Sequence, residues 1–234
     1  MVKALLFDFF GTLVEYQPDR AMLGAPRTHE LAAALGFEGD HDRFVDVWDS
    51  ASLSLEADSR RTLREFSMTD AAVAFGAATG LNLSGDEAVA LGELYLEEWM
   101  RHVEVVPGVP DLIRRLAGRV DIAVVSNTHD RNMVPDMLDD MGVGAEIDSI
   151  VLSVDHGWIK PHDSMYTVAL DRLGCAPPDA MFVGDTFEAD YAGPIRAGMQ
   201  ALLIDPHGEH SIPAGHRIAT VLDVATVLDR DIAR

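Results

Sequence analysis

The chain has 234 residues, of which 48% are hydrophobic, enough for one large or two modest domains with a buried core. Its formal net charge of −21 argues against nucleic acid and anionic membranes as partners, and it leaves open a salt-adapted source. No apolar run approaches the roughly 20 residues that span a bilayer, and the first predicted strand begins too early for a secretory signal. Because Cys175 is the only cysteine, no intramolecular disulfide can form, and we expect a cytoplasmic protein.

The first predicted element is a strand over residues 4–7, where four apolar residues follow one another. Such a run is typical of a strand buried on both faces of a parallel sheet. Asp8 comes where this strand should end, and Gly11 and Thr12 predict a turn. Ligands of open α/β sheets bind beyond the carboxyl ends of the strands, so Asp8 is a candidate functional residue. The alternative, an aspartate that only forms the turn, is equally compatible with this stretch.

Residues 15–104 show helical periodicity and no clear strand. Apolar residues recur at spacings of three and four, which predicts helices over 28–35, 42–53, 60–78 and 86–102. Ser84 and the pair Thr69-Asp70 are candidate helix starts. We therefore expect an all-helical insertion over residues 15–104, which could act as a lid because both of its junctions lie beside Asp8.

Strands and helices alternate after the break at Pro107. The patterns predict strands over 121–126, 149–153, 180–184 and 200–204, and helices over 111–116, 130–141, 164–173 and 189–197. This alternation predicts an α/β fold, a Rossmann-like doubly wound parallel sheet formed by residues 1–14 and 105–234.

Polar residues also follow the later strands: Ser126, Lys160, Asp185 and Asp190. In a parallel sheet these side chains would meet Asp8 at one edge. Carboxylates suit Mg²⁺, and a lysine with a hydroxyl suits the oxygens of a phosphoryl group. Each residue alone could cap a helix or lie on the surface, but their recurrence at successive strand ends favours one site.

Four short motifs occur in order along the chain: Phe7–Leu13, Val125–Asn127, Lys160-Pro161 and Gly184–Asp190. They resemble the four motifs of the haloacid dehalogenase (HAD) superfamily of hydrolases, in the branch with a helical cap after the first motif. Each motif is weak alone, but their order, spacing and cap position match over nearly the whole chain.

The resemblance implies roles for these residues. Asp8 would be the nucleophile that forms an aspartyl-phosphate, and Thr12 would orient its loop. Ser126, Asn127 and Lys160 would bind the transferring group of the substrate.

The resemblance also implies a Mg²⁺ site. Its expected ligands are Asp8, the backbone carbonyl of Phe10 and Asp185, with Asp190 supporting them.

Phe10 departs from the pattern of phosphatases in this family. They carry a second aspartate at this position, which protonates the leaving oxygen and then activates water. Phenylalanine can do neither, and general acid–base catalysis is worth about 10²–10⁴-fold. The candidates to replace that aspartate are His129, Asp130 and Glu15, although solvated loop or helix-start positions explain all three.

Two branches of the family lack the second aspartate. Phosphonatases need a cap lysine, and residues 15–104 contain none. Dehalogenases carry a bulky aromatic residue there, need no metal and use a cap arginine, for which Arg20, Arg27 and Arg43 are available. Their fourth motif, however, lacks the acidic character of Gly184-Asp185.

We therefore expect a Mg²⁺-dependent phosphatase acting on a small phosphorylated metabolite, without nucleic-acid or membrane partners. The alternatives are a 2-haloacid dehalogenase and a weakly active or inactive protein that binds a phosphorylated ligand. The loop histidines His207, His210 and His216 are compatible with zinc, but a solvated loop explains them better. Substrate identity and oligomeric state stay open.

Overall fold

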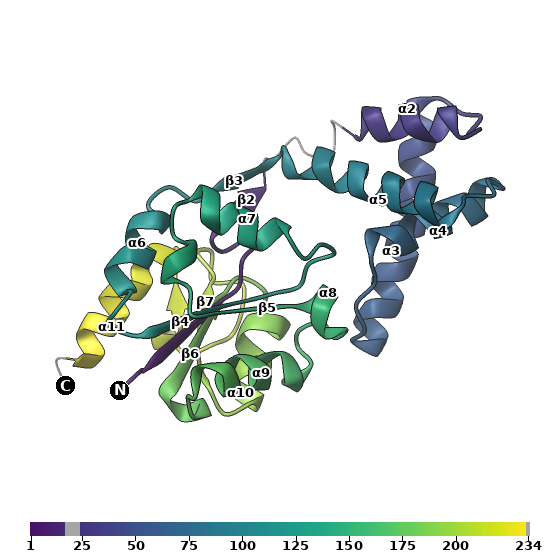
Figure 1. Cartoon of the computed structure of the whole chain (residues 1–234). Coiled ribbons are helices and arrows are strands. Elements are labelled where there is room, and N and C mark those ends of the chain that lie inside the picture. The colour runs from purple at the N-terminus through teal and green to yellow at the C-terminus, as the bar shows by residue number, and fades with distance from the viewer. Residues whose placement is uncertain (17–23, 233–234) are drawn as a thin grey trace. The chain divides into compact units, whose positions relative to one another are not determined.

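The computed structural model describes residues 1–16 and 24–232 (Figure 1). The chain divides into two compact units, one of Met1–Glu15 with Val105–Arg234 and one of Tyr16–Glu104. The boundaries expected from the sequence fall after residues 14 and 104. None of the helices within the described ranges is long and apolar enough to cross a membrane.

The first unit contains a six-stranded parallel sheet in the order β5-β4-β1-β6-β7-β8. The strands are β1 (Ala4–Phe7), β4 (Asp121–Ser126), β5 (Ser149–Leu152), β6 (Ala180–Gly184), β7 (Gln200–Ile204) and β8 (Arg217–Ile218). All four residues of β1 are buried, as the uninterrupted apolar run predicts. The predicted Rossmann-like parallel sheet is confirmed. The sequence did not predict β8, because two residues carry no periodicity.

Helices connect and cover the strands of this sheet (Figure 1). They are α6 (Val109–Leu116), α7 (Met133–Asp140), α8 (Ser153–His156), α9 (Asp163–Leu173), the π-helical segment η3 (Phe187–Ala192), α10 (Gly193–Arg196) and α11 (Val224–Ile232). Short 3₁₀ turns are η1 (Gly144–Glu146), η2 (Pro177–Asp179), η4 (Ala214–His216) and η5 (Val221–Asp223). The prediction of one α-helix over 189–197 is wrong in its first part, because these residues belong to the π-helical segment η3, which precedes α10. The helices α8 and α11 were not predicted from the sequence.

The second unit contains α2 (Pro26–Ala34), α3 (His41–Thr62), α4 (Met68–Thr79) and α5 (Gly85–Met100). Buried aromatic and aliphatic residues, including Phe44, Trp48 and Phe75, form its core. The break predicted between the helices over 42–53 and 60–78 is wrong, because α3 continues without interruption to Thr62. The actual start of α4 is set by Ser67, whose hydroxyl accepts a hydrogen bond from the backbone N–H of Asp70.

A short two-stranded sheet, β2 (Val14–Tyr16) with β3 (Val103–Val105), joins the start and end of the insertion. The prediction that residues 15–104 contain no strand is therefore wrong at both ends. Strands of three residues carry too little periodicity to detect, and their pairing joins segments far apart in the sequence.

The predicted start of α5 at Ser84 is confirmed and leads to a stability prediction. The hydroxyl of Ser84 accepts a hydrogen bond from the N–H of Glu87, whose carboxylate accepts one from the N–H of Ser84. Ser84→Ala should therefore lower the free energy of unfolding by about 1 kcal/mol. Chemical denaturation measures this, with Ser54→Ala, an exposed position within α3, as the matched control. Equal losses in both variants would contradict the capping role.

Candidate active site

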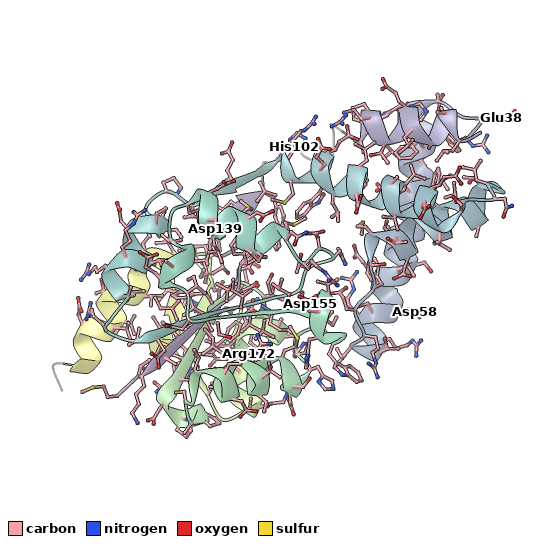
Figure 2. The ribbon with its side chains drawn as sticks, in the orientation of Figure 1. Glu38, Asp58, His102, Asp139, Asp155 and Arg172 are labelled. Carbon is pink, nitrogen blue, oxygen red and sulfur yellow. The ribbon has the colours of Figure 1, made fainter. Side chains whose placement is uncertain are left out.

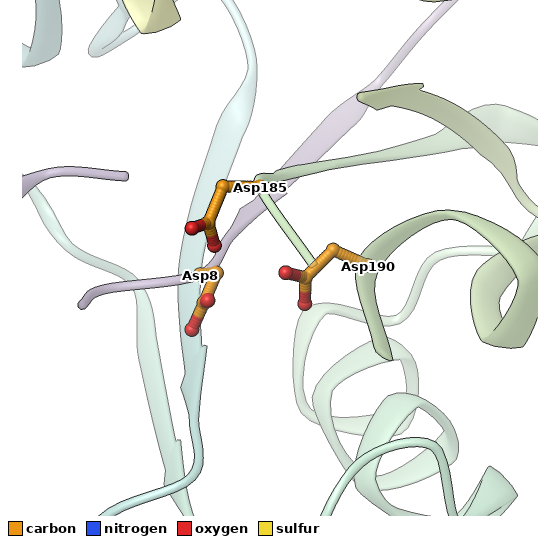
Figure 3. Close-up of side chains that lie close together, drawn as sticks. All are labelled: Asp8, Asp185 and Asp190. Carbon is orange, nitrogen blue, oxygen red and sulfur yellow. The ribbon is translucent and has the colours of Figure 1, made fainter. Parts of the chain in front are cut away.

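Three aspartates converge at the carboxyl ends of β1 and β6 (Figure 3). Because Phe7 of β1 pairs with Val183 of β6, the residues that follow the two strands come side by side. Asp8, Asp185 and Asp190 each offer a carboxylate oxygen, and these oxygens lie within 4.8 Å of one another. The structure thus brings together carboxylates that are nearly two hundred residues apart in the chain.

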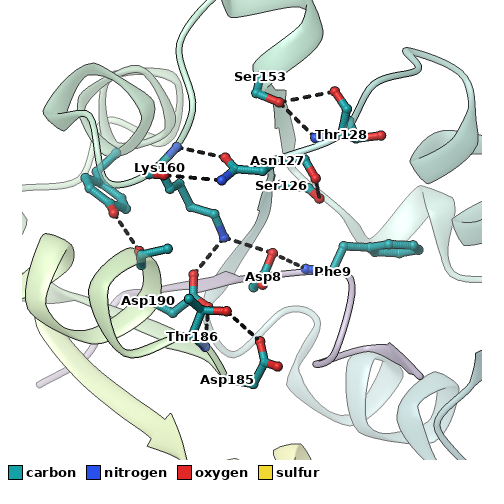
Figure 4. Close-up of polar contacts among 12 residues, drawn as sticks. Asp8, Phe9, Ser126, Asn127, Thr128, Ser153, Lys160, Asp185, Thr186 and Asp190 are labelled. Atoms are coloured by element: carbon teal, nitrogen blue, oxygen red, sulfur yellow. Dashed lines mark hydrogen bonds and ion pairs between the residues drawn. The ribbon is translucent and has the colours of Figure 1, made fainter. Parts of the chain in front are cut away.

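Lys160 joins two of these aspartates (Figure 4). Its Nζ lies 2.8 Å from Oδ1 of Asp8 and 2.7 Å from Oδ1 of Asp190. Lys160 and Asp190 are almost fully buried. Burial disfavours the ammonium form, but Asp190 and Asp8 outweigh this effect and raise the pKa of Lys160. The lysine is therefore a fixed positive charge within the carboxylate group.

The two oxygens of Asp8 have different surroundings. Oδ1 accepts hydrogen bonds from Nζ of Lys160 and, at 2.7 Å, from the backbone N–H of Phe9. Within the described part of the chain, no hydrogen bond to Oδ2 is found. One oxygen thus orients the carboxylate, and the other is available for reaction or for a metal ion.

Asp190 has both oxygens engaged by protein groups. Oδ1 binds Lys160, and Oδ2 accepts a hydrogen bond from the backbone N–H of Thr186 at 2.9 Å. Burial, followed by the charge of Asp8, raises the pKa of Asp190. Its carboxylate also lies so close to Gly184 that a Cβ there would be 2.4 Å from its Cγ. Asp190 therefore positions Lys160 and the turn after β6, and the support of a Mg²⁺ site expected of it stays a prediction.

Asp185 is the solvent-exposed member of the group. Its carboxylate packs on Gly11 so closely that a Cβ on Gly11 would lie 2.4 Å from Oδ2 of Asp185. Gly11 also has φ of +82°, in the region that favours glycine. Partial loss of solvation and then the charge of Asp8 raise the pKa of Asp185. The glycine thus lets the loop after Asp8 approach Asp185.

The donor set fits a divalent cation. Three carboxylates and one ammonium carry a formal charge of −2 within a few ångströms. Oxygen ligands of this kind suit Mg²⁺, which usually takes one or two protein carboxylates and keeps several waters. Asp8 and Asp185 have oxygens left for such an ion, whereas the oxygens of Asp190 are used by Lys160 and Thr186.

Asn127 holds the backbone of Lys160 (Figure 4). Its Oδ1 accepts a hydrogen bond from the N–H of Lys160 at 2.7 Å, and its Nδ2 donates one to the carbonyl of Lys160 at 3.2 Å. The family resemblance implied a substrate-binding role for Asn127, and its pairing with Lys160 was not predicted. No local pattern signals it, because the two residues come from different loops.

Ser126, the last residue of β4, and Thr12, in the loop after β1, are both buried. Among the residues that the structure describes, the hydroxyl of Ser126 donates one long hydrogen bond, 3.4 Å, to the carbonyl of Asn127, so it can still turn toward a ligand. Oγ1 of Thr12 has no hydrogen-bond partner among the described residues. Backbone bonds hold this loop, since the carbonyl of Phe9 accepts from the N–H groups of Thr12, Leu13 and Val14. The loop-orienting role expected of Thr12 stays a prediction.

The candidates for the missing acid are placed as follows. Asp130 accepts hydrogen bonds at Oδ1 from the N–H groups of Asn132 and Met133, so it caps the start of α7. Glu15 lies exposed in β2, and His129 is half-buried in the loop after β4. Phe10 is half-buried and packs edge-on against Phe9, with 5.1 Å between the ring centroids. Asp130 thus stabilises the start of a helix, which was the alternative to a catalytic role given for it above.

The other candidate residues lie as follows. Arg27 forms an ion pair with Glu97, and Arg20 lies outside the described residues. His216 bonds to Tyr191, and His210 stacks on Phe187. In the described ranges, the aspartate group above is the one cluster of three or more metal-ligating side chains found, so the histidines form no zinc site there.

A family model described as haloacid dehalogenase-like hydrolase matches residues 2–198. The chain belongs to this family. The hydrolase is 30% identical over 214 residues to ribulose-1,5-bisphosphate 5-phosphatase of Halopiger xanaduensis, a match that covers 89% of this chain and 87% of the relative. It is 28% identical over 127 residues to 5-amino-6-(5-phospho-D-ribitylamino)uracil phosphatase of Escherichia coli, covering 53% and 51% of the two chains.

Solved structures share the fold of this HAD-like hydrolase. A 2-haloacid dehalogenase from Pseudomonas syringae superposes with a TM-score of 0.70 at 23% identity, covering 98% of this chain and 99% of that one. A HAD phosphatase from Thermococcus onnurineus gives 0.68 at 24% identity, covering 97% and 98%. Phosphatases and dehalogenases thus share this fold, and the fold alone does not choose between them.

The pairing of Asn127 with Lys160 leads to a kinetic prediction. In Asn127→Ala the backbone of Lys160 loses two hydrogen bonds, so its ammonium should be held less firmly beside Asp8. We expect kcat to fall about tenfold, since small misplacements of a positioning group cost roughly this much or more. Asn132→Ala, which precedes α7, is the matched control. A rise in KM with unchanged kcat would instead support direct substrate binding by Asn127.

Proposed function

We propose that this hydrolase is a Mg²⁺-dependent phosphatase that acts on a small phosphorylated metabolite through an aspartyl-phosphate at Asp8. The observation that carries the proposal is the group of three carboxylates, two of which pair with one buried lysine. An uncompensated charge of this kind is costly in a partly buried site unless a cation neutralises it. Bound Mg²⁺ would neutralise these carboxylates and the charge of a phosphoryl group.

Each residue of the site has its own role in the proposed reaction. Oδ2 of Asp8 attacks phosphorus, so that an O–P bond to Asp8 forms while the bond to the leaving oxygen breaks. Lys160 and the hydroxyl of Ser126 bind the non-bridging phosphoryl oxygens. The leaving oxygen takes its proton from solvent, because Phe10 has none to give. Water then cleaves the aspartyl-phosphate and restores Asp8.

The relatives support a phosphate ester as the substrate. The names of several denote phosphatases of phosphorylated sugars or their derivatives, among them ribulose-1,5-bisphosphate 5-phosphatase and N-acetylmuramic acid 6-phosphate phosphatase. We therefore propose a screen that begins with sugar phosphates. The single cysteine supports a cytoplasmic location, and the acidic composition supports a small-molecule substrate over nucleic acid or membrane.

Phe10 favours a second candidate, a 2-haloacid dehalogenase. Halide leaves without a proton, so an aromatic residue in place of the acid is compatible with that reaction. Dehalogenases of this family need no metal, however, and without a cation three carboxylates with one lysine would repel a haloacid, which is itself an anion. A third candidate, a protein that binds a phosphorylated ligand without turnover, is also compatible with Phe10.

Metal removal separates these candidates. With the natural protein, a chelator should abolish release of inorganic phosphate, and added Mg²⁺ should restore it. Release of halide from 2-haloacids is the parallel assay, and it should stay at background with or without Mg²⁺. Chelator-resistant halide release would contradict the proposal and favour the dehalogenase. Binding of phosphate esters without any turnover would favour the third candidate.

A further inference from the structure

The ammonium of Lys160 lies over the face of an aromatic ring. Its Nζ is 5.0 Å from the centroid of the Phe182 ring, within the range of about 6 Å over which an aromatic face attracts a cation. Phe182 belongs to β6 and is fully buried, and Lys160 is almost fully buried. Because this attraction is strongest where water is excluded, the ring is a third support of the lysine charge besides Asp8 and Asp190.

The packing around Phe182 fixes the direction of its ring. Tyr166 of α9 meets it edge-on, with 5.6 Å between the ring centroids and 89° between the ring planes. The hydroxyl of Tyr166 donates a hydrogen bond to the carbonyl of Ala189 in η3, and a Cβ on Gly193 would collide with that hydroxyl. The helix α9, which carries Arg172 in its last turn, packs on this face of the sheet (Figure 2). Buried neighbours therefore hold the ring in one orientation.

The three N–H donors of the Lys160 ammonium are not all used. Nζ lies 2.8 Å from Oδ1 of Asp8 and 2.7 Å from Oδ1 of Asp190, which accounts for two of them. Within the described ranges of the chain, no hydrogen-bond acceptor is found for the third. An aromatic face attracts the ammonium through the quadrupole of the ring and does not require an N–H to point at it, whereas a carboxylate or carbonyl oxygen would take one.

We propose that Phe182 is a positioning residue for the reaction at Asp8. Its ring holds the ammonium of Lys160 beside Asp8 and leaves one N–H of that ammonium for a phosphoryl oxygen of the substrate. An aliphatic side chain of similar size would fill the same space but would not attract the charge. The inference rests on the proposed function, because Lys160 serves that reaction by binding the phosphoryl group.

Stepwise fluorination of the Phe182 ring tests the electrostatic part of this role. Fluorine withdraws electron density from the ring face and adds little volume, so phenylalanines with one, two and three ring fluorines weaken the attraction in steps. We expect kcat for phosphate release to fall at each step, by about fivefold in total, with a smaller change in KM and in the unfolding temperature. Phe75, equally buried in the core of the helical unit, is the matched control, and the same series there should leave kcat unchanged.

A second measurement detects the contact without any turnover. Lys3 and Lys160 are the two lysines of the chain, so a protein labelled at lysine gives two sets of signals in a nuclear magnetic resonance spectrum. The ring of Phe182 should displace the side-chain proton signals of Lys160 upfield from those of Lys3, which is exposed and pairs with Asp179. Phe182→Leu should remove this displacement and leave the signals of Lys3 in place.

Two results would overturn the inference. One is a kcat that stays constant through the fluorinated series at Phe182, or that falls equally in the series at Phe75. The other is a set of Lys160 signals that Phe182→Leu does not move. Absence of phosphate release from the natural protein would contradict the proposed function instead, and the lysine signals would then decide alone whether the ring holds Lys160.

Discussion

The Phe10→Asp variant is expected to hydrolyse alkyl phosphates about 10²–10⁴-fold faster than the natural protein. Aspartate at this position could protonate the leaving oxygen and then activate water, the two tasks that Phe10 cannot perform. The gain should be largest for sugar phosphates, whose alkoxide leaving groups need a proton. It should be smaller for aryl phosphates, whose phenolate leaves more readily. Steady-state rates on both substrate types measure the difference.

Two further variants control this experiment. Phe10→Asn introduces a side chain of nearly the same size as Phe10→Asp does, but its amide cannot act as an acid or base. Phe10→Ala only removes the ring. Neither should increase the rate substantially. If all three variants gained equally, the ring of Phe10 would act by blocking the site and not by replacing an acid. If the natural protein already hydrolyses alkyl phosphates efficiently and Phe10→Asp gains nothing, another residue supplies the proton.

The Asp8→Asn variant is expected to lose about 10⁴-fold or more in kcat, as removal of a nucleophile typically does. An amide has almost the shape of a carboxylate but cannot attack phosphorus. Because Lys160 keeps its ion pair with Asp190, the fold should remain intact. Phosphate release and thermal unfolding should both be measured on the same preparation.

Asp205→Asn is the matched control for Asp8→Asn. Asp205 is also buried and also pairs with a cation, since its Oδ2 lies 3.0 Å from Nε of Arg217. This control should lose stability but keep kcat. Comparable kcat in Asp8→Asn and the natural protein would exclude Asp8 as the nucleophile.

The central features of the fold were readable from the sequence because they repeat a local pattern. β1, β4 and β6 are largely apolar runs with a polar residue at the last position or directly after it, and a parallel sheet aligns those ends. The sequence alone therefore predicts that Asp8 lies beside Asp185. The strands β2 and β3 were missed because each has three residues and is defined only by its distant partner.

The arrangement inside the site was less predictable. Which groups each carboxylate binds depends on how loops approach one another, so the pairing of Asn127 with the backbone of Lys160 has no local signature. The π-helical turn after Asp185 likewise depends on Asp190, whose carboxylate accepts from the N–H of Thr186. The sequence identified the chemical groups, and the structure was needed to show which of them hold the others.

The most direct test of the account is to look for a phosphoryl group on Asp8. Acetyl phosphate has a leaving group that needs no proton, so with Mg²⁺ it should phosphorylate the natural protein. Without an acid–base residue at position 10, the acyl-phosphate should hydrolyse slowly and accumulate. Acid quenching and peptide mass mapping should then find one phosphoryl group on Asp8, and none in Asp8→Asn or after chelation. An unmodified Asp8, or a phosphoryl group on another residue, would contradict the account.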